Sequence, residues 1–126
     1  MPILEVDIVG ELEPVARKGL AARFADVVGH ALRSRPRGTW VKVNLIPRAL
    51  YAENAGGPEP GVMPVFVRVL ARDVPEGDAL GAQVRDLTRA VALVCGRPEA
   101  NVHVLYEPSA TGRLAFGGKL VVPPEG

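Results

Sequence analysis

The sequence contains little cysteine, few aromatic residues and almost no excess of charge. Cys95 is the only cysteine among 126 residues, so no disulfide can form within one chain, and a reducing location such as the cytoplasm is the expectation. Fifteen Lys and Arg side chains are balanced by fourteen Asp and Glu, a formal net charge of +1. Because a nucleic-acid-binding protein needs a surplus of basic residues over one face, we expect no nucleic-acid partner.

Long hydrophobic runs and targeting signals are absent from the sequence as well. Residues 1–7 lack the basic start and apolar stretch of a signal peptide, and no run approaches the roughly 18 apolar residues of a membrane span. We therefore expect a cytoplasmic protein that makes no membrane contact. Since 48% of the residues are hydrophobic, the chain can bury a core without metals or disulfides, and its length predicts a single domain over residues 1–126.

Sequence motifs of several common catalytic sites are missing too. His30 and His103 are far apart in the sequence and lack the spacing of zinc ligands. The Gly-Gly-Lys segment at residues 117–119 lacks the remainder of a phosphate-binding loop. Neither Ser34 nor Ser109 lies in the Gly-x-Ser-x-Gly turn of a serine hydrolase. We expect neither a metal ion nor another cofactor.

The sequence does contain an internal repeat. Residues 2–8 alternate apolar and polar side chains with the period of a strand. Residues 64–70 show a similar alternation, and both segments begin with a proline. A helical apolar pattern follows each strand, and a second strand is predicted at residues 40–47 and again at 101–108, about 61 residues later. The helical stripes consist of Leu20, Phe24, Val27, Val28 and Ala31 in the first copy and of Leu80, Val84, Leu87, Val91 and Val94 in the second.

The predicted fold is α+β, a duplicated β-α-β unit covering about residues 2–52 and 64–108 and followed by a C-terminal tail. A strand, a helix and a strand in this order pair in parallel, so the two units predict a four-stranded, mostly parallel sheet with two helices on one face. The other face of the sheet must also be shielded from solvent, because the strands have apolar residues too regularly for one side to remain exposed to water. We expect this face to be buried by self-association with further copies of the chain.

The sequence also predicts where the elements end. Pro14 suits the first turn of the first helix, Asp78 the cap of the second helix, and Gly96 its end. Residues 48–63 are rich in Gly and Pro and predict a loop with at most a short edge strand. Residues 117–123 predict a flexible hinge and a short strand that could pair with the sheet edge of a neighbouring subunit.

Pro2 is an unusual candidate for chemistry, because it directly follows the initiator Met. Removal of Met1 is expected before a proline and would leave a secondary amine at the start of a strand. An apolar surround and nearby cations favour the neutral form of such an amine, which can then take a proton beside a carbonyl group. The alternative is that Pro2 only begins an edge strand.

Pro2 opening the first strand, the two β-α-β units, Pro64 leading the third strand and the glycine-rich tail together resemble the tautomerase superfamily. The resemblance is strongest for its longer members, the cis-3-chloroacrylic acid dehalogenase-like and macrophage migration inhibitory factor-like proteins. It implies a homotrimeric enzyme that uses an amino-terminal proline. The matching positions of the dehalogenase group follow without a gap, at Pro2, His30, Val43-Asn44, Val65-Phe66-Val67 and Arg72.

The resemblance implies a cofactor-independent tautomerase or isomerase that acts on a small 2-oxo or 2-hydroxy (enol) carboxylic acid. Pro2 would move a proton between enol oxygen and carbon, Arg72 would bind a substrate carboxylate and stabilise the enolate, and His30 would contact the substrate or shape the pocket. For each of these side chains, a purely structural role is the alternative. Further candidates for substrate binding are Arg68, Lys42, His103, Tyr106 and Phe116.

The sequence departs from the dehalogenases at three positions. Pro75 stands where they have a second arginine, Leu105 where they have a tyrosine, and Phe116 near their water-activating glutamate. Tyr106 is one step from Leu105 and therefore points to the opposite face of its strand. Without a carboxylate to activate water, a dehalogenase or hydratase of acrylate-type acids is disfavoured but stays open. A non-catalytic trimer that serves as a binding or scaffold protein is the third possibility.

Overall fold

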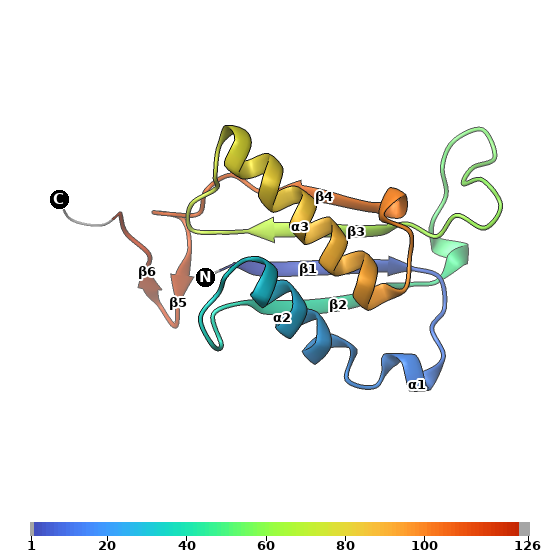
Figure 1. Ribbon diagram of the computed structural model, residues 1–126, viewed down its shortest axis with the longest axis horizontal. Coiled ribbons are helices and arrows are strands. Elements are labelled where there is room, and N and C mark those ends of the chain that lie inside the picture. The colour runs from blue at the N-terminus through green and yellow to red at the C-terminus, as the bar shows by residue number, and fades with distance from the viewer. Residues whose placement is uncertain (1, 124–126) are drawn as a thin grey trace.

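Four strands form one sheet in the order β2-β1-β3-β4 (Figure 1). A computed structural model describes residues 2–123 of the protein. Strands β1 and β2 pair in parallel, as do β3 and β4, while β1 and β3 are antiparallel in the middle of the sheet. The predicted α+β fold with a duplicated β-α-β unit is confirmed. The strands are β1 (Ile3–Val9), β2 (Trp40–Ile46), β3 (Val65–Leu70) and β4 (Val102–Tyr106).

The antiparallel pairing of β1 and β3 determines which chain segments lie at the same end of the sheet. Since β1 and β2 run one way and β3 and β4 the other, the starts of β1 and β2 lie beside the ends of β3 and β4 (Figure 1). The register places Ile3 opposite both Trp40 and Leu70. Loops that are distant in the sequence therefore meet around the N-terminal residues.

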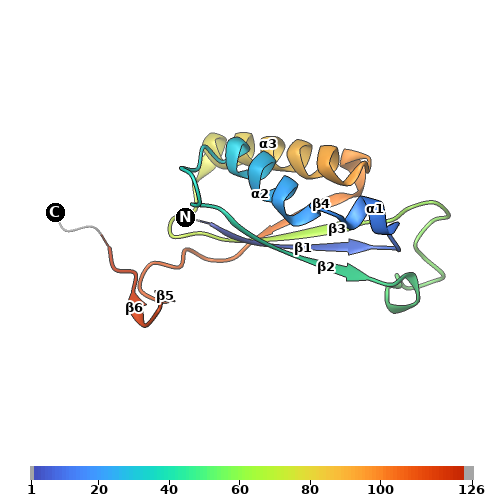
Figure 2. The ribbon, with the colours of Figure 1, turned by 90° about the horizontal axis from the view of Figure 1, so that it is seen from below.

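Two helices cover one face of the sheet, as predicted. Helix α2 (Leu20–Ala31) and helix α3 (Gly77–Cys95) lie side by side on it (Figure 2). The apolar stripes of both helices bury themselves against the inward-facing residues of the strands. Within residues 2–123, no helix covers the opposite face. The largest fully buried side chains include Phe24 and Val28 of α2, Leu87 and Val91 of α3, and Leu4, Val6, Val65, Val67 and Val69 of the strands.

The predicted starts of the two helices need correction. Pro14 begins a separate one-turn helix, α1 (Pro14–Arg17), and Gly19 breaks the chain before α2 with a φ of 69°. Only glycine adopts this left-handed conformation easily, so the first helical segment is divided there. Asp78 does not cap α3, because the helix begins one residue earlier and Asp78 lies within its first turn. Gly96 ends α3 in the left-handed conformation, as predicted.

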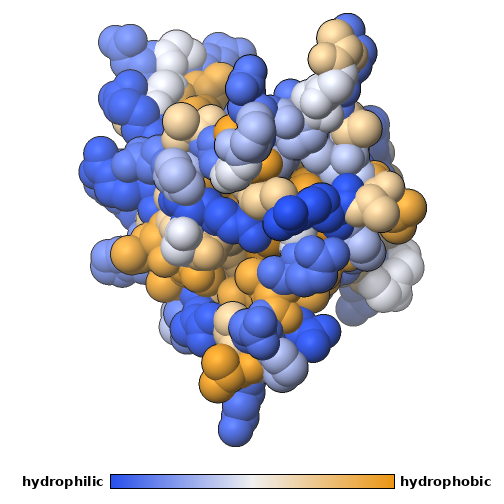
Figure 3. Space-filling model, turned by 90° about the vertical axis from the view of Figure 1, so that its right-hand side faces the viewer, coloured by the Kyte–Doolittle hydropathy of each residue, from blue (hydrophilic) through white to orange (hydrophobic). Residues whose placement is uncertain are grey.

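The connector between the two units is mostly irregular. It contains the 3-10 turn η1 (Arg48–Leu50) and a single β-bridge between Glu53 and Gly57. A second 3-10 turn, η2 (Glu99–Asn101), precedes β4. Arg97 ties this end of the sheet together, since its Nη1 donates to the carbonyl oxygens of Val9 at 3.0 Å and Met63 at 2.8 Å. Seen from this end, patches of apolar side chains interrupt a mostly polar surface (Figure 3).

The C-terminal tail forms a small hairpin. Strand β5 (Ala115–Phe116) pairs antiparallel with β6 (Lys119–Leu120), and Gly117 and Gly118 form the turn with φ values of 57° and 85°. Two consecutive positive φ angles are typical of a tight hairpin turn. The two glycines thus form a defined turn, and the expected tail strand pairs with β5 of its own chain. The flexibility of this segment and its pairing with a neighbouring subunit stay predictions. None of the helices that the structure describes is long and apolar enough to cross a membrane.

Cys95 at the end of α3 is partly buried against the core. Burial raises the pKa of its thiol from 9.0 to about 11, although nearby Arg97 lowers it. Only the thiolate reacts with iodoacetamide, so we expect the alkylation rate of the folded protein to rise about tenfold per pH unit up to pH 10. The urea-unfolded chain, measured as the control, should level off near pH 9. A folded-state rate that also levels off there would contradict the effect of burial.

Candidate functional site

Pro2 lies at the end of the sheet where several loops meet. It is buried directly before β1, and its carbonyl oxygen accepts a hydrogen bond from the Trp40 amide at 3.1 Å. This bond continues the parallel pairing of β1 and β2 by one residue. The turn that precedes Trp40 is thereby held next to Pro2.

A pocket of about 250 Å³ opens beside Pro2. Its wall combines two cations, Arg33 and Arg35, with the carboxylate of Asp73 and the amide of Gln83. These side chains come from the turn between α2 and β2, the loop after β3 and the second turn of α3. The remaining lining residues are Leu32, Ser34, Gly38 and Val69. The pocket thus offers positive charge and polar donors next to Pro2.

The turn between α2 and β2 is tight and fixes the two arginines. Arg33 has a φ of 55°, a left-handed conformation that is uncommon for a residue with a side chain. The Ser34 amide donates to the Gly29 oxygen at 2.8 Å, and the Gly38 amide to the Arg35 oxygen at 2.9 Å. A Cβ on Gly38 would lie only 2.9 Å from that same Arg35 oxygen. Glycine is therefore required there for the turn to close.

Tyr106 contacts the pocket through Gln83. Its hydroxyl donates to Gln83 Oε1 at 2.6 Å, and the ring lies on the helix-covered side of β4 against the core. Leu105, the preceding residue, is 58% exposed on the other face, as strand alternation predicts. Burial raises the pKa of the Tyr106 hydroxyl, so the group stays protonated and acts as a donor at neutral pH.

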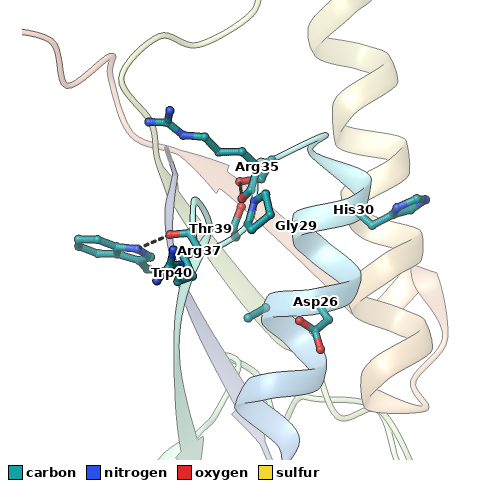
Figure 4. Close-up of a pocket in the computed structure, with 10 residues that line it drawn as sticks. Asp26, Gly29, His30, Arg35, Arg37, Thr39 and Trp40 are labelled. Carbon is teal, nitrogen blue, oxygen red and sulfur yellow. Dashed lines mark hydrogen bonds between the residues drawn. The ribbon is translucent and has the colours of Figure 1, made fainter.

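His30 does not line the pocket of Pro2. It belongs to a separate hollow of about 610 Å³ between α2 and the start of β2. In Figure 4 its ring lies on the side of α2 away from Trp40. The two pockets share Ser34 and Arg35. The structure does not bring His30 to Pro2, and its predicted catalytic role stays a prediction.

Arg72 is held by the C-terminal tail. Its Nη2 donates to the Val122 oxygen at 3.1 Å, and its own carbonyl oxygen accepts from the Thr111 hydroxyl at 2.9 Å. The guanidinium Nε lies 3.9 Å from a carboxylate oxygen of Asp73, the next residue. Arg72 is thus next in sequence to a residue of the Pro2 pocket without lining it. Its predicted role in binding a carboxylate stays a prediction.

Lys42 and Arg68 lie on the uncovered face of the sheet. Lys42 Nζ is 3.0 Å from Glu5 Oε1, and Arg68 Nε is 3.0 Å from Glu107 Oε1. Both pairs are largely exposed. The pocket of Pro2 is lined from the other face, by residues such as Val69. The sheet therefore separates these two predicted substrate-binding cations from Pro2 within one chain.

His103 and Phe116 also lie away from Pro2's pocket. The His103 ring is on the uncovered face, 5.5 Å from the ring centre of Phe66. Phe116, in the tail hairpin, makes an edge-to-face contact with Trp40 at 5.2 Å. Within residues 2–123, no group of three His, Cys, Asp or Glu side chains is placed to hold a metal ion.

Solved structures of known proteins share this arrangement over most of their length. Pt0534 inactivated by 2-oxo-3-pentynoate aligns with a TM-score of 0.70 at 16% identity, over 94% of each chain. Native fused 4-OT aligns with a TM-score of 0.71 at 15% identity, over 94% of this chain and 95% of its own. The macrophage migration inhibitory factor-like protein of Entamoeba histolytica gives 0.69 at 10% identity, over 94% and 97%. No family model matches the sequence, and no curated protein is similar to it.

Each of these alignments covers 94% of the chain. The chain has the tautomerase fold. The resemblance noted in the sequence is thereby confirmed at the level of the fold. In this tautomerase fold, Pro2 is at the start of the first strand and borders a pocket that contains arginine side chains.

Sequence reasoning missed the charged and amide side chains of the pocket in this tautomerase fold. They are Arg33, Arg35, Asp73 and Gln83. One signal for the arginines was present, because residues 33–37 contain three arginines directly before a strand that pairs in parallel with β1. The loop before β2 must then lie beside the start of β1. No comparable signal pointed to Asp73 and Gln83, because they lie near Pro2 only as a result of the antiparallel pairing of β1 and β3.

Proposed function

We propose that the protein is a cofactor-independent tautomerase or isomerase that uses the Pro2 amine as general base on a small 2-oxo or 2-hydroxy (enol) carboxylic acid. The observation that carries the proposal is the shared pocket of Pro2, Arg33 and Arg35 at the start of β1. In this proposal Met1 is removed, which leaves the amine of Pro2 free. Burial and the guanidinium groups of the two arginines that line the pocket favour the neutral, basic form of that amine, whereas the Asp73 carboxylate in the same wall acts in the opposite direction.

The proposed reaction needs only a proton transfer in two steps. The neutral amine takes the proton of the enol hydroxyl, and the negative charge spreads over the oxygen at C2 and the carbon at C3. The protonated amine then delivers its proton to C3, which gives the 2-oxo acid and restores the neutral amine. In this proposal Arg33 and Arg35, which line the pocket, bind the substrate carboxylate through forked hydrogen bonds from their guanidinium groups. Arg72 could add a further cation only after its bond to Val122 opens.

A structural neighbour supports the choice of substrate class. Pt0534, which has a similar fold, is inactivated by 2-oxo-3-pentynoate, itself a 2-oxo acid. A carboxylate next to an oxygen at C2 also suits the pocket, because it combines guanidinium groups with the neutral amide of Gln83. We extend this substrate class to the present protein as part of the proposal.

Ketonisation of phenylenolpyruvate, followed by ultraviolet absorbance, tests the proposed reaction. We expect a rate clearly above that of buffer, and an intact mass that lacks Met1. The mass measurement is essential, because retained Met1 would convert the Pro2 nitrogen into an amide with no basic lone pair. Full retention of Met1, or a rate equal to that of buffer for this and other enol acids, would contradict the proposal.

We also propose that the uncovered face of the sheet forms a homotrimer interface. Phe66 and Leu105 expose 36% and 58% of their surface on this face, and fused 4-OT structures with a similar fold are trimers. Light scattering should give three times the chain mass of 13.4 kDa. Leu105→Glu should reduce that mass, whereas Leu93→Glu, on the exposed side of α3, should not. A monomeric wild-type protein would contradict the interface.

Asp73 favours a second candidate function, a hydratase or dehalogenase of acrylate-type acids. The sequence argument against this function was the absence of a carboxylate near Phe116, and Asp73 supplies a carboxylate to the same pocket from another position. Such a group can activate a water molecule. Chloride release from 3-chloroacrylate that is lost in Asp73→Asn, but kept in Asp86→Asn on α3, would support it. If neither reaction is found, the non-catalytic binding or scaffold role is favoured.

A further inference from the structure

Gln83 occupies a particular place in the pocket, because its amide is a neutral polar group among charged neighbours, while the other neutral polar side chain, Ser34, donates its hydroxyl hydrogen to the Arg35 backbone oxygen. Gln83 lies in the second turn of α3 and is half-buried. The first turns of α3 lie at the end of the sheet where β1 begins (Figure 1). Pro2, Arg33, Arg35 and Asp73 line the same pocket. The Gln83 amide, which can bind a neutral or partly charged oxygen, thus shares a pocket with the arginines proposed to bind the carboxylate and with the proposed base, Pro2.

The hydrogen bond from Tyr106 determines which end of the amide faces the pocket. An amide side chain can turn its oxygen or its nitrogen towards a neighbour. The Tyr106 hydroxyl donates to Oε1 at 2.6 Å. The Gln83 oxygen is therefore occupied. Within residues 2–123, Nε2 has no protein acceptor, so its two hydrogens are free to donate to a ligand.

We propose that Gln83 is the residue that recognises the oxygen at C2 of the substrate, and that Tyr106 is a positioning residue that orients the Gln83 amide. This inference rests on the proposed function, because it assigns the second polar contact of the same substrate. When the base removes the enol proton, negative charge grows on the C2 oxygen, and a fixed N–H donor stabilises that charge. Tyr106, predicted from the sequence to bind substrate, acts through Gln83 instead.

The assignment predicts a preference that can be measured without turnover. At neutral pH, 2-oxobutyrate and butyrate both carry a carboxylate, but only the first has an oxygen at C2. Contacts with the carboxylate are common to both acids, whereas the Gln83 donor adds a hydrogen bond to the 2-oxo acid. We expect the wild-type protein to bind 2-oxobutyrate about fivefold or more tightly, in keeping with one net hydrogen bond.

Three variants test the roles of the two side chains. Gln83→Met keeps the length of the side chain without a donor, and should lose the preference and lower kcat for phenylenolpyruvate about tenfold to a hundredfold, with KM changed less than about threefold. Gln83→Glu keeps the acceptor for Tyr106 but replaces the donor with a negative charge, and should lower kcat further. Tyr106→Phe should lose part of the preference. Its effect should not add to that of Gln83→Met in the double variant, since both act through one amide.

Tyr51→Phe is the matched control. The Tyr51 hydroxyl donates to Glu53 at 2.6 Å in the connector, at the opposite end of the sheet, so both the preference and kcat should stay unchanged. Titrations of the full chain followed by amide NMR shifts measure the two affinities. Equal binding of both acids by the wild type, an unchanged preference in Gln83→Met, or additive effects in the double variant would overturn the role of Gln83. Absence of ketonisation by a wild type that retains the preference would contradict the proposed reaction instead.

Discussion

Replacing Pro2 by alanine is expected to lower kcat for ketonisation by about 10²–10⁴-fold, the usual contribution of a positioned general base. The proline ring fixes its nitrogen at the start of β1, beside Arg33 and Arg35. An N-terminal alanine keeps an amine but lets it rotate away from the substrate. Since Met1 is also removed before alanine, the variant changes the base and not the processing of the chain. The rate and the melting temperature should be measured together for both proteins.

Insertion of one alanine between Met1 and Pro2 provides a second variant with a different defect. Pro2 then keeps its ring and its place before β1, but its nitrogen becomes an amide and the free amine moves one residue away. The rate should fall at least as far as in Pro2→Ala, with the hydrogen bond from the Trp40 amide to the Pro2 oxygen preserved. Equal ketonisation rates in the wild type and both variants would contradict a catalytic role of the N-terminal amine.

Phe24→Ala is expected to lower the free energy of unfolding by about 3–5 kcal/mol. The Phe24 ring is fully buried between α2 and the sheet, with 0% of its surface exposed. Truncation removes most of its apolar contacts and leaves a cavity that the rigid sheet cannot close. Because net stabilities of single domains are commonly 5–15 kcal/mol, this one change would remove a large part of the total. Urea unfolding at constant protein concentration measures it.

Val15→Ala serves as the control for this measurement. Val15 lies in the one-turn helix α1 and is 81% exposed, so its truncation should change the free energy of unfolding by no more than about 0.5 kcal/mol. A loss below about 1 kcal/mol for Phe24→Ala would mean that α2 does not contribute its apolar face to the core in solution.

The repeating pattern of the sequence predicted the strands and helices because periodicity reports burial. Residues 2–8 and 64–70 alternate in both sequence and structure, and Phe24 of the first helical stripe is buried as expected. The breaks within the elements were less predictable. Gly19 divides the first helical segment although no period in the sequence changes there. Such breaks depend on single backbone angles, to which hydrophobic patterns are insensitive.

The pocket was harder to predict than the fold, because spacing along the chain does not determine the direction of a side chain. Strand alternation correctly separated Tyr106 from Leu105. For Arg72 and His30 the expectation came from a resemblance in spacing, and in the structure the tail holds Arg72 while His30 lies in a different hollow. The contact of Arg72 with Val122 joins residues 50 positions apart, which no local pattern reveals.

The antiparallel pairing of β1 and β3 also determines where the second-unit counterpart of Pro2 lies. Pro64 is the counterpart of Pro2 in the second unit, but it lies buried at the opposite end of the sheet, where its carbonyl oxygen accepts from the Val9 amide at 3.1 Å. Its nitrogen is part of a peptide bond and cannot be a base. A chain cut between Met63 and Pro64 would convert that nitrogen into a second secondary amine. The duplicated architecture thus contains two equivalent positions for a terminal proline. Because the chain is continuous through Pro64, only the position of Pro2 can have a free amine.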